Sequence, residues 1–151
     1  MVAVSPKDVI CGLAMWPLPQ EGGMISETAR DEHFSAIAYL LESPDFSHPH
    51  CLPTVEIWFY QAGSPLSMLT IDPSGTLEER TLGPDVAAGE NLQLVVPGGC
   101  WQSSKSLGVW SLVGTVMAPP YDEQTVSFAD RDALVAKFPQ HTNSIDIWLR
   151  Q

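Results

Sequence analysis

The stretch HPHCLPTVEIWFYQAGSPL, residues 48–66, decides how this chain folds. Its centre, residues 55–60, is rich in the β-branched and aromatic residues that are enriched in strands. This run carries a single carboxylate, Glu56, follows two histidines, His48 and His50, and ends at a Gly-Ser-Pro turn. Burying a carboxylate or an imidazole without partners is costly. The stretch therefore predicts a central strand that contributes to a small-molecule site.

Short apolar segments lie on both sides of this stretch and are separated by turn signals. Residues 72–75, Asp-Pro-Ser-Gly, form a clear example, since each of the Asp, Pro and Gly favours a turn for its own reason. Residues 34–41 are almost wholly apolar, as in strands that are buried on both faces. Many short strands separated by turns indicate an all-β sandwich or barrel. We expect strands at residues 24–28, 34–41, 55–60, 66–71, 76–82, 92–96, 100–104 and 110–117.

Short helices are expected only near the two ends of the chain. Ser5 followed by Pro6 is a typical helix start, with serine as the cap and proline at the first position. Near the other end, Leu134 and Phe138 are spaced by one helical turn, which predicts a helix over residues 130–138. The residues that follow, through Trp148, allow more than one structure. No repeat or linker divides the chain, so we expect one domain over residues 1–151.

Composition restricts the class of protein. With 44% hydrophobic residues the chain can bury a core, and its net charge of −11 argues against binding nucleic acid or an anionic membrane. Three cysteines, Cys11, Cys51 and Cys100, are too few for a disulfide framework and fit a reducing compartment. No apolar run reaches the roughly 18 residues of a membrane span, and the N-terminus does not resemble a secretory signal. We expect a cytoplasmic protein that binds a small molecule.

A series of motifs follows in unbroken order over residues 5–139: MWPLPQEGG at 15–23 with Glu27 and Thr28; His50, Glu56, Ile57, Trp58, Gly63, Pro65 and Leu66; residues 82–85, Gly89, Glu90, Gln93, residues 95–97, Gly99, Trp101 and Gln102; and Val113, Gly114, Val116, Ala118, Pro119, Phe138 and Pro139. This series resembles the DUF985 (cupin_5) family of small single-domain cupins. The resemblance implies a double-stranded β-helix, the cupin jelly-roll barrel, with a pocket at one end and a homodimeric assembly. It implies no defined reaction, because the activity of the family is mostly undefined.

The sequence departs from the usual family pattern around the central strand. Cys51 stands where the family usually has arginine, and Val55 stands where it has aspartate. Phe59 and Gln61 replace two histidines that tend to follow the tryptophan. These changes make the pocket mouth less basic and more apolar, so we expect a hydrophobic substrate.

The metal ligands of the cupin superfamily are also incomplete. Metal-binding relatives typically supply His, His and Glu from the first motif and another His from the second. His50 and Glu56 occupy two of these positions, but Leu52 and Gln102 occupy the other two. Two good ligands and one amide make a poor site for Zn or Fe. We therefore expect no resident cofactor; if a metal is bound, the candidate ligands are His50, Glu56, Gln102 and His48.

The remaining groups favour acid–base catalysis. Glu56 and His50 would exchange a proton, and Gln102 would polarise a carbonyl or enolate oxygen of the substrate. Strand alternation places Glu56, Trp58 and Tyr60 on one face of their strand. The structural alternative for Glu56 is a carboxylate that anchors a neighbouring loop. The expected substrate-binding residues are Trp58, Tyr60, Tyr39, Arg30, Cys51 and Trp101, although Arg30 could instead pair with the acids beside it.

The leading hypothesis is a metal-independent isomerase, epimerase, cyclase or lyase. Its substrate would be a rather apolar metabolite, for example one of secondary metabolism. The alternative is a non-catalytic cupin that binds a small molecule or acts as a scaffold. A metal-dependent oxygenase is the third hypothesis, and it needs a ligand that the sequence does not clearly provide.

Overall fold

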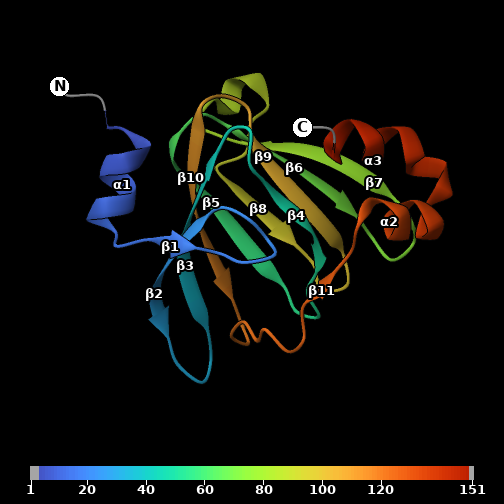
Figure 1. Cartoon of the computed structure of the whole chain (residues 1–151), viewed down its shortest axis with the longest axis horizontal. Helices are drawn as coiled ribbons and strands as arrows, with labels where there is room; N and C mark the ends of the chain where they lie inside the picture. Colours follow the sequence, from blue (N-terminus) through green and yellow to red (C-terminus); the bar gives the residue numbers. More distant parts are fainter. Residues whose placement is uncertain (1–3, 150–151) are drawn as a thin grey trace.

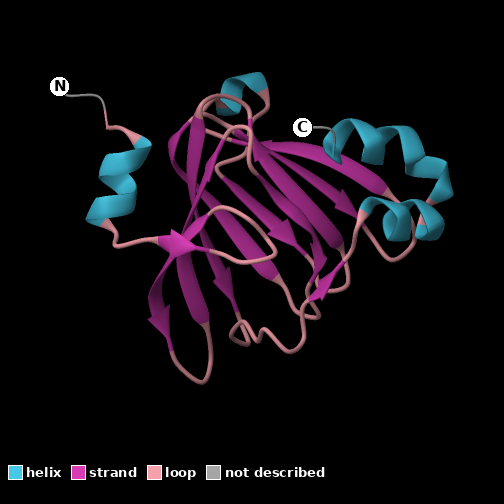
Figure 2. Ribbon diagram, in the orientation of Figure 1, coloured by secondary structure: helices cyan, strands magenta, loops and turns pink. Residues whose placement is uncertain are grey.

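The computed structural model describes residues 4–149, and their strands form two antiparallel sheets (Figures 1 and 2). In spatial order, the first sheet contains β1 (Trp16–Pro17), β2 (Met24–Arg30), β3 (Ser35–Glu42), β10 (Trp110–Met117), β5 (Glu56–Gly63) and β8 (Gln93–Val96). The second sheet contains β11 (Ser127–Phe128), β4 (Phe46–Cys51), β9 (Trp101–Ser106), β6 (Leu66–Ile71) and β7 (Leu77–Leu82). This is a two-sheet antiparallel sandwich of the kind that the sequence predicts.

The main core lies between the two sheets. Strands place alternate side chains on opposite faces, and the inward positions of β3, β5, β6 and β10 carry large apolar residues. These side chains form one cluster with residues of β7 and β8: Tyr39, Leu41, Trp58, Leu66, Met68, Leu82, Leu94, Val96, Cys100 and Val113. Each is largely removed from water, which is the dominant favourable contribution to folding.

The helices cover the outer faces of the sheets. The first helix, α1 (Pro6–Gly12), begins at a capping box in which Ser5 and Asp8 each bond the backbone of the other. Its Val9 packs against the outward residues of β3 and β10. On the opposite side, α2 (Arg131–Lys137) and α3 (Thr142–Leu149) pack against the second sheet (Figure 1). No helix within residues 4–149 is long and apolar enough to cross a membrane.

Most of the expected elements are present, with four differences. The short strand β1, which pairs with β2, was not expected. Helix α3 forms where the sequence allowed several structures, and it buries Ile145 and Trp148. The short strand β11 pairs with β4. Strand β4 itself is unexpected, since Pro49 interrupts the pattern. A register shift between Ser47 and His50 in the β4–β9 pairing accommodates the proline. His50 therefore lies in a strand and not in a loop.

Candidate active site

A pocket of about 1220 Å³ opens at one end of the sandwich. Its walls come from both sheets and from two segments that cross the opening, residues 18–21 and 119–126. Apolar side chains such as Leu18, Ile37 and Met117 make up much of the lining. Concave pockets with such a mixed, largely apolar lining are typical places for small organic molecules to bind in proteins.

Glu56 stands at the start of β5 in the wall of this pocket and is only 6% exposed. Burial raises the pKa of its carboxyl above the ordinary value, and the charge of Glu21 acts in the same direction. The charge of His50 and hydrogen bonds from Gln102 and Thr115 lower the pKa, but burial is the largest effect. The carboxyl therefore holds a proton more readily than an exposed glutamate does.

Gln102 reaches Glu56 from the opposite sheet. The amide Nε2 of Gln102, on β9, donates a hydrogen bond of 2.7 Å to Oε2 of Glu56. From the sequence we expect Gln102 to donate a hydrogen bond to an oxygen of the substrate. In the structure it donates this hydrogen bond to Glu56. Gln102 thus holds the Glu56 carboxylate in place.

His50 completes this group from β4, where it is 2% exposed and pairs with Gln102 in the strand register. Its Nδ1 lies 2.8 Å from the carbonyl oxygen of His48. Because a carbonyl can only accept, Nδ1 carries the proton in the neutral ring, and Nε2 presents a lone pair. The structure therefore brings His50, Glu56 and Gln102 together as the sequence predicts.

Glu21 is a fourth member that sequence analysis missed, because it lies in a turn. Its carboxylate Oε1 accepts a hydrogen bond of 3.1 Å from Ser47 and lies 3.8 Å from Nε2 of His50. The backbone oxygen of Glu21 accepts from the amide of His48 at 2.7 Å. No spacing in the sequence signals this contact, since it forms only when the β1–β2 turn folds across β4.

Two aromatic residues form the inner wall, as predicted. Trp58 and Tyr39 both line the pocket and meet edge to face with ring centroids 6.0 Å apart. The phenol of Tyr39 donates to the carbonyl of Gly22 at 2.8 Å, and burial raises its pKa well above the ordinary value. A side chain at Gly23 would place its Cβ 2.7 Å from the Tyr39 ring, so this close packing of the turn requires glycine.

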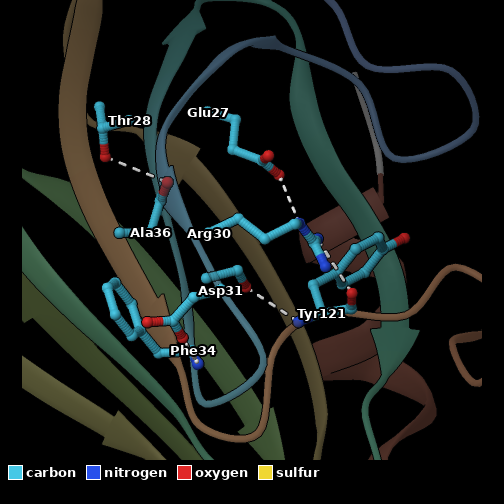
Figure 3. A network of polar contacts seen from close by, with 8 residues as sticks. Glu27, Thr28, Arg30, Asp31, Phe34, Ala36 and Tyr121 are labelled. Atoms are coloured by element: carbon cyan, nitrogen blue, oxygen red, sulfur yellow. Dashed lines mark hydrogen bonds and ion pairs between the residues drawn. The ribbon is translucent and has the colours of Figure 1, made fainter.

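Arg30 also lines the pocket, but its guanidinium is engaged by the protein (Figure 3). Nε lies 3.0 Å from the Glu27 carboxylate, and Nη2 donates to the backbone oxygen of Tyr121 at 3.0 Å. The amide of Tyr121 donates to Ser35 at 2.9 Å. Arg30 thus pairs with a neighbouring acid, which was the alternative to a role in substrate binding. Its bond to Tyr121 also holds the segment 119–126 at the pocket opening.

Three expected substrate contacts are corrected by the structure. Cys51 and Trp101 follow His50 and Gln102 directly, so strand alternation turns them to the outer face of the second sheet. There Trp101 packs beneath the C-terminal helices. Tyr60 packs against the core and donates to the carbonyl of Gly63 at 2.8 Å, at the far end of β5 from the pocket.

Comparisons with known proteins agree with this architecture. Residues 7–129 match the family model Cupin_5, described as cupin superfamily (DUF985). The chain belongs to the Cupin_5 family. Protein SO0799 from Shewanella oneidensis is a similar structure with a TM-score of 0.91 and 32% identity, covering 98% of this chain and 99% of that one. No curated protein matches the sequence.

Two further structures show how far the similarity reaches. A hypothetical protein from Leishmania major has a TM-score of 0.89 and 27% identity, covering 98% of this Cupin_5 chain and 100% of that chain. Oxalate decarboxylase from Bacillus subtilis has a TM-score of 0.62 and 14% identity, covering 89% of this chain and 37% of that one. At that identity the similarity shows the cupin fold alone.

The donors in this Cupin_5 pocket do not fit the metal centre that the cupin superfamily implies. Within residues 4–149, no three His, Cys, Asp or Glu side chains are grouped to hold a metal ion. Gln102 could offer a metal only its carbonyl oxygen Oε1, because its amide nitrogen carries hydrogens and donates to Glu56, and an amide oxygen is a weak ligand for Zn or Fe. His48, the further candidate ligand, is exposed and its ring stacks on Phe46 with centroids 4.3 Å apart. We assign no chemical step to a metal.

Proposed function

We propose that this Cupin_5 protein is an enzyme that moves a proton on an organic small molecule by acid–base chemistry. The reaction class would be that of an isomerase, epimerase, cyclase or lyase. The observation that carries the proposal is the environment of Glu56, a buried pocket carboxyl whose pKa burial raises. General acids and bases work best when their pKa lies near the working pH, and burial is one way to bring a glutamate there.

His50 supplies a second proton-transfer group on the facing sheet. With Nδ1 directed at the His48 carbonyl, Nε2 can accept a proton and return it. One group would take the proton from a carbon beside a carbonyl, leaving its electron pair on the enolate oxygen. The other would return a proton to a carbon of the same intermediate. Proton exchange with solvent then resets both groups, and no redox partner is needed.

The lining supports a substrate with an apolar body. Ile25, Ile37 and Met117 offer alkyl surface, and Trp58 with Tyr39 offers aromatic surface. The phenol of Tyr39 is bound to Gly22, and burial keeps it protonated, so it serves as a wall and not as the base. This arrangement agrees with the apolar metabolite expected from the sequence.

A second candidate is a binding protein without chemistry. The hydrogen bond between Gln102 and Glu56 joins strands of the two sheets, so the carboxylate also serves as a structural fastener. In that case the pocket would bind its ligand whether or not position 56 can transfer a proton.

Solvent deuterium exchange separates the two candidates without knowledge of the product. A panel of cyclic and aryl ketones is incubated in D₂O with the wild type, Glu56→Gln or Glu42→Gln, and loss of the C–H signal beside the carbonyl is followed by NMR. Glu42 is an exposed residue at the end of β3, so it provides a matched control. We expect catalysed exchange with the wild type and Glu42→Gln and none with Glu56→Gln. Equal exchange in all three proteins would refute the mechanism, and binding without exchange would favour the second candidate.

A further inference from the structure

We propose that the pocket selects an organic cation, an apolar ligand that carries a protonated amine. This inference rests on the proposed function for the reaction that follows binding, but the binding itself can be measured separately. It concerns the charge of the pocket, which the proton-transfer proposal leaves open.

The ionisable residues of the lining are mostly acidic. Arg30 is the only lysine or arginine in the lining among the described residues, 4–149. Its guanidinium already binds the Glu27 carboxylate and the backbone oxygen of Tyr121 (Figure 3). Among the described lining residues, an anionic ligand would therefore meet one Lys or Arg, already paired with Glu27, and it would enter a field of negative charge. The acidic lining residues are Glu21, Glu27, Glu56, Asp122 and Glu123.

The side chain of Tyr121 responds to this field. Burial is the largest cause of the raised pKa of its phenol, and the charges of four lining carboxylates raise this pKa further. Those four are Glu21, Glu123, Glu56 and Asp122. They come from three segments of the chain, since only Asp122 and Glu123 are neighbours, so the fold brings them together. A field that opposes negative charge on Tyr121 stabilises positive charge in the same space.

The aromatic lining suits the same ligand. Aromatic faces attract organic cations, most strongly where water is excluded, and they also cover an apolar body. Trp58 is 1% exposed and lines the pocket, so water is largely excluded from its ring. The aromatic lining residues are Trp16, Tyr39, Trp58, Tyr121 and Phe128.

An inorganic cation fits the pocket less well than an amine. Across residues 4–149 the carboxylates do not form a group that could coordinate a metal. An ammonium group needs no coordination sphere, because distributed carboxylates and aromatic faces can each stabilise it. The spacing of the acids therefore points to a molecular cation.

Three probes with one ring system test the proposal: tryptamine, tryptophol and indole-3-acetate. At neutral pH they are cationic, neutral and anionic, and their dissociation constants are measured by calorimetry at low and high salt. We expect tryptamine to bind about tenfold more tightly than tryptophol, a difference of about 1.4 kcal/mol. Indole-3-acetate should bind most weakly, and added salt should reduce the preference for tryptamine.

A charge-neutralising variant provides the matched comparison. The Glu123→Gln substitution should weaken the binding of tryptamine several-fold and leave the affinity for tryptophol unchanged. The Glu42→Gln substitution should change neither affinity. Equal binding of tryptamine and tryptophol, tightest binding of indole-3-acetate, or no binding of any probe would overturn the proposal. A preference for tryptamine without deuterium exchange on any ketone would uphold the ligand class and count against the proton-transfer function.

Discussion

The amide of Gln102 donates a 2.7 Å hydrogen bond to the carboxylate of Glu56, and this bond connects the two sheets at the pocket wall. Both side chains are buried, with exposed fractions of 2% and 6%. A buried hydrogen bond to a charged group contributes more than an exposed neutral one. We therefore expect the stability of the fold and the protonation of Glu56 to be coupled through this pair.

Replacing Gln102 with leucine should destabilise the protein at pH 7 by about 1–3 kcal/mol, because a buried carboxylate loses its donor. Its loss should also raise the pKa of Glu56 further, since the Gln102 hydrogen bond lowers that pKa. The penalty should shrink in acid, where Glu56 is protonated. Urea unfolding at two pH values measures both effects. Gln124→Leu, at an exposed loop position, should change stability by no more than about 0.5 kcal/mol; equal losses at the two sites would contradict the assignment.

The pH dependence of stability should differ between the wild type and Glu56→Gln. The folded pKa of Glu56 is raised above 4.5, so its stabilising contribution is complete below that pH and is lost as pH rises through the folded pKa. The variant lacks this titration. Its free energy of unfolding should therefore increase relative to the wild type from acid to neutral pH. A difference that stays constant across this range would show that burial does not perturb Glu56.

Two tyrosines allow a matched test of the pocket wall. Tyr39 and Tyr60 each donate a hydrogen bond of 2.8 Å to a glycine carbonyl, but Tyr39 is almost fully buried and Tyr60 is not. Tyr39→Phe should cost about 1 kcal/mol in urea unfolding, because the partly buried Gly22 carbonyl loses its partner. Tyr60→Phe should cost less, since water can replace the phenol. A larger loss at Tyr60 would mean that the turn does not depend on Tyr39.

Arg30→Met should loosen the segment that crosses the pocket. Without the bond from Nη2 to Tyr121, backbone amides of residues 119–126 should exchange with deuterium faster, as measured by mass spectrometry. Global stability should fall by no more than about 1 kcal/mol, because the ion pair with Glu27 is partly exposed. Arg80→Met, which removes a 3.6 Å ion pair with Glu78 on β7, is the control. It should leave exchange in residues 119–126 unchanged.

Local pattern was sufficient to predict β2, β3, β5 and β10, the strands of the first sheet that contribute most of its pocket residues. Residues 110–117 were expected as a strand, and β10 has the same bounds. In β5, alternation predicts that Glu56 and Trp58 share a face, and both line the pocket. These strands can be predicted because burying every second side chain produces an alternation of apolar and polar residues in the sequence.

The parts that could not be predicted depend on contacts between distant segments. Glu21 meets His50 because a turn folds across β4, and no spacing encodes that approach. Family resemblance assigned Gln102 to the site but not its partner, since an amide can bind substrate or a neighbouring carboxylate equally well. Strand β4 lacks a clear pattern because its register shift lies at Pro49.

The bulge at Gln61 in β5 predicts where members of this family can gain or lose a residue in this strand. Between Leu112 and Val113 the pairing with β10 skips Gln61, since Val113 lies opposite Tyr60 and Leu112 opposite Ala62. Losing Gln61 would thus convert a bulge into a regular ladder and leave the inward side chain of Glu56 in place. A one-residue insertion or deletion within residues 57–60 would instead turn Glu56 out of the pocket. Length variation among homologues that retain the site should therefore fall at Gln61 and avoid the four residues before it.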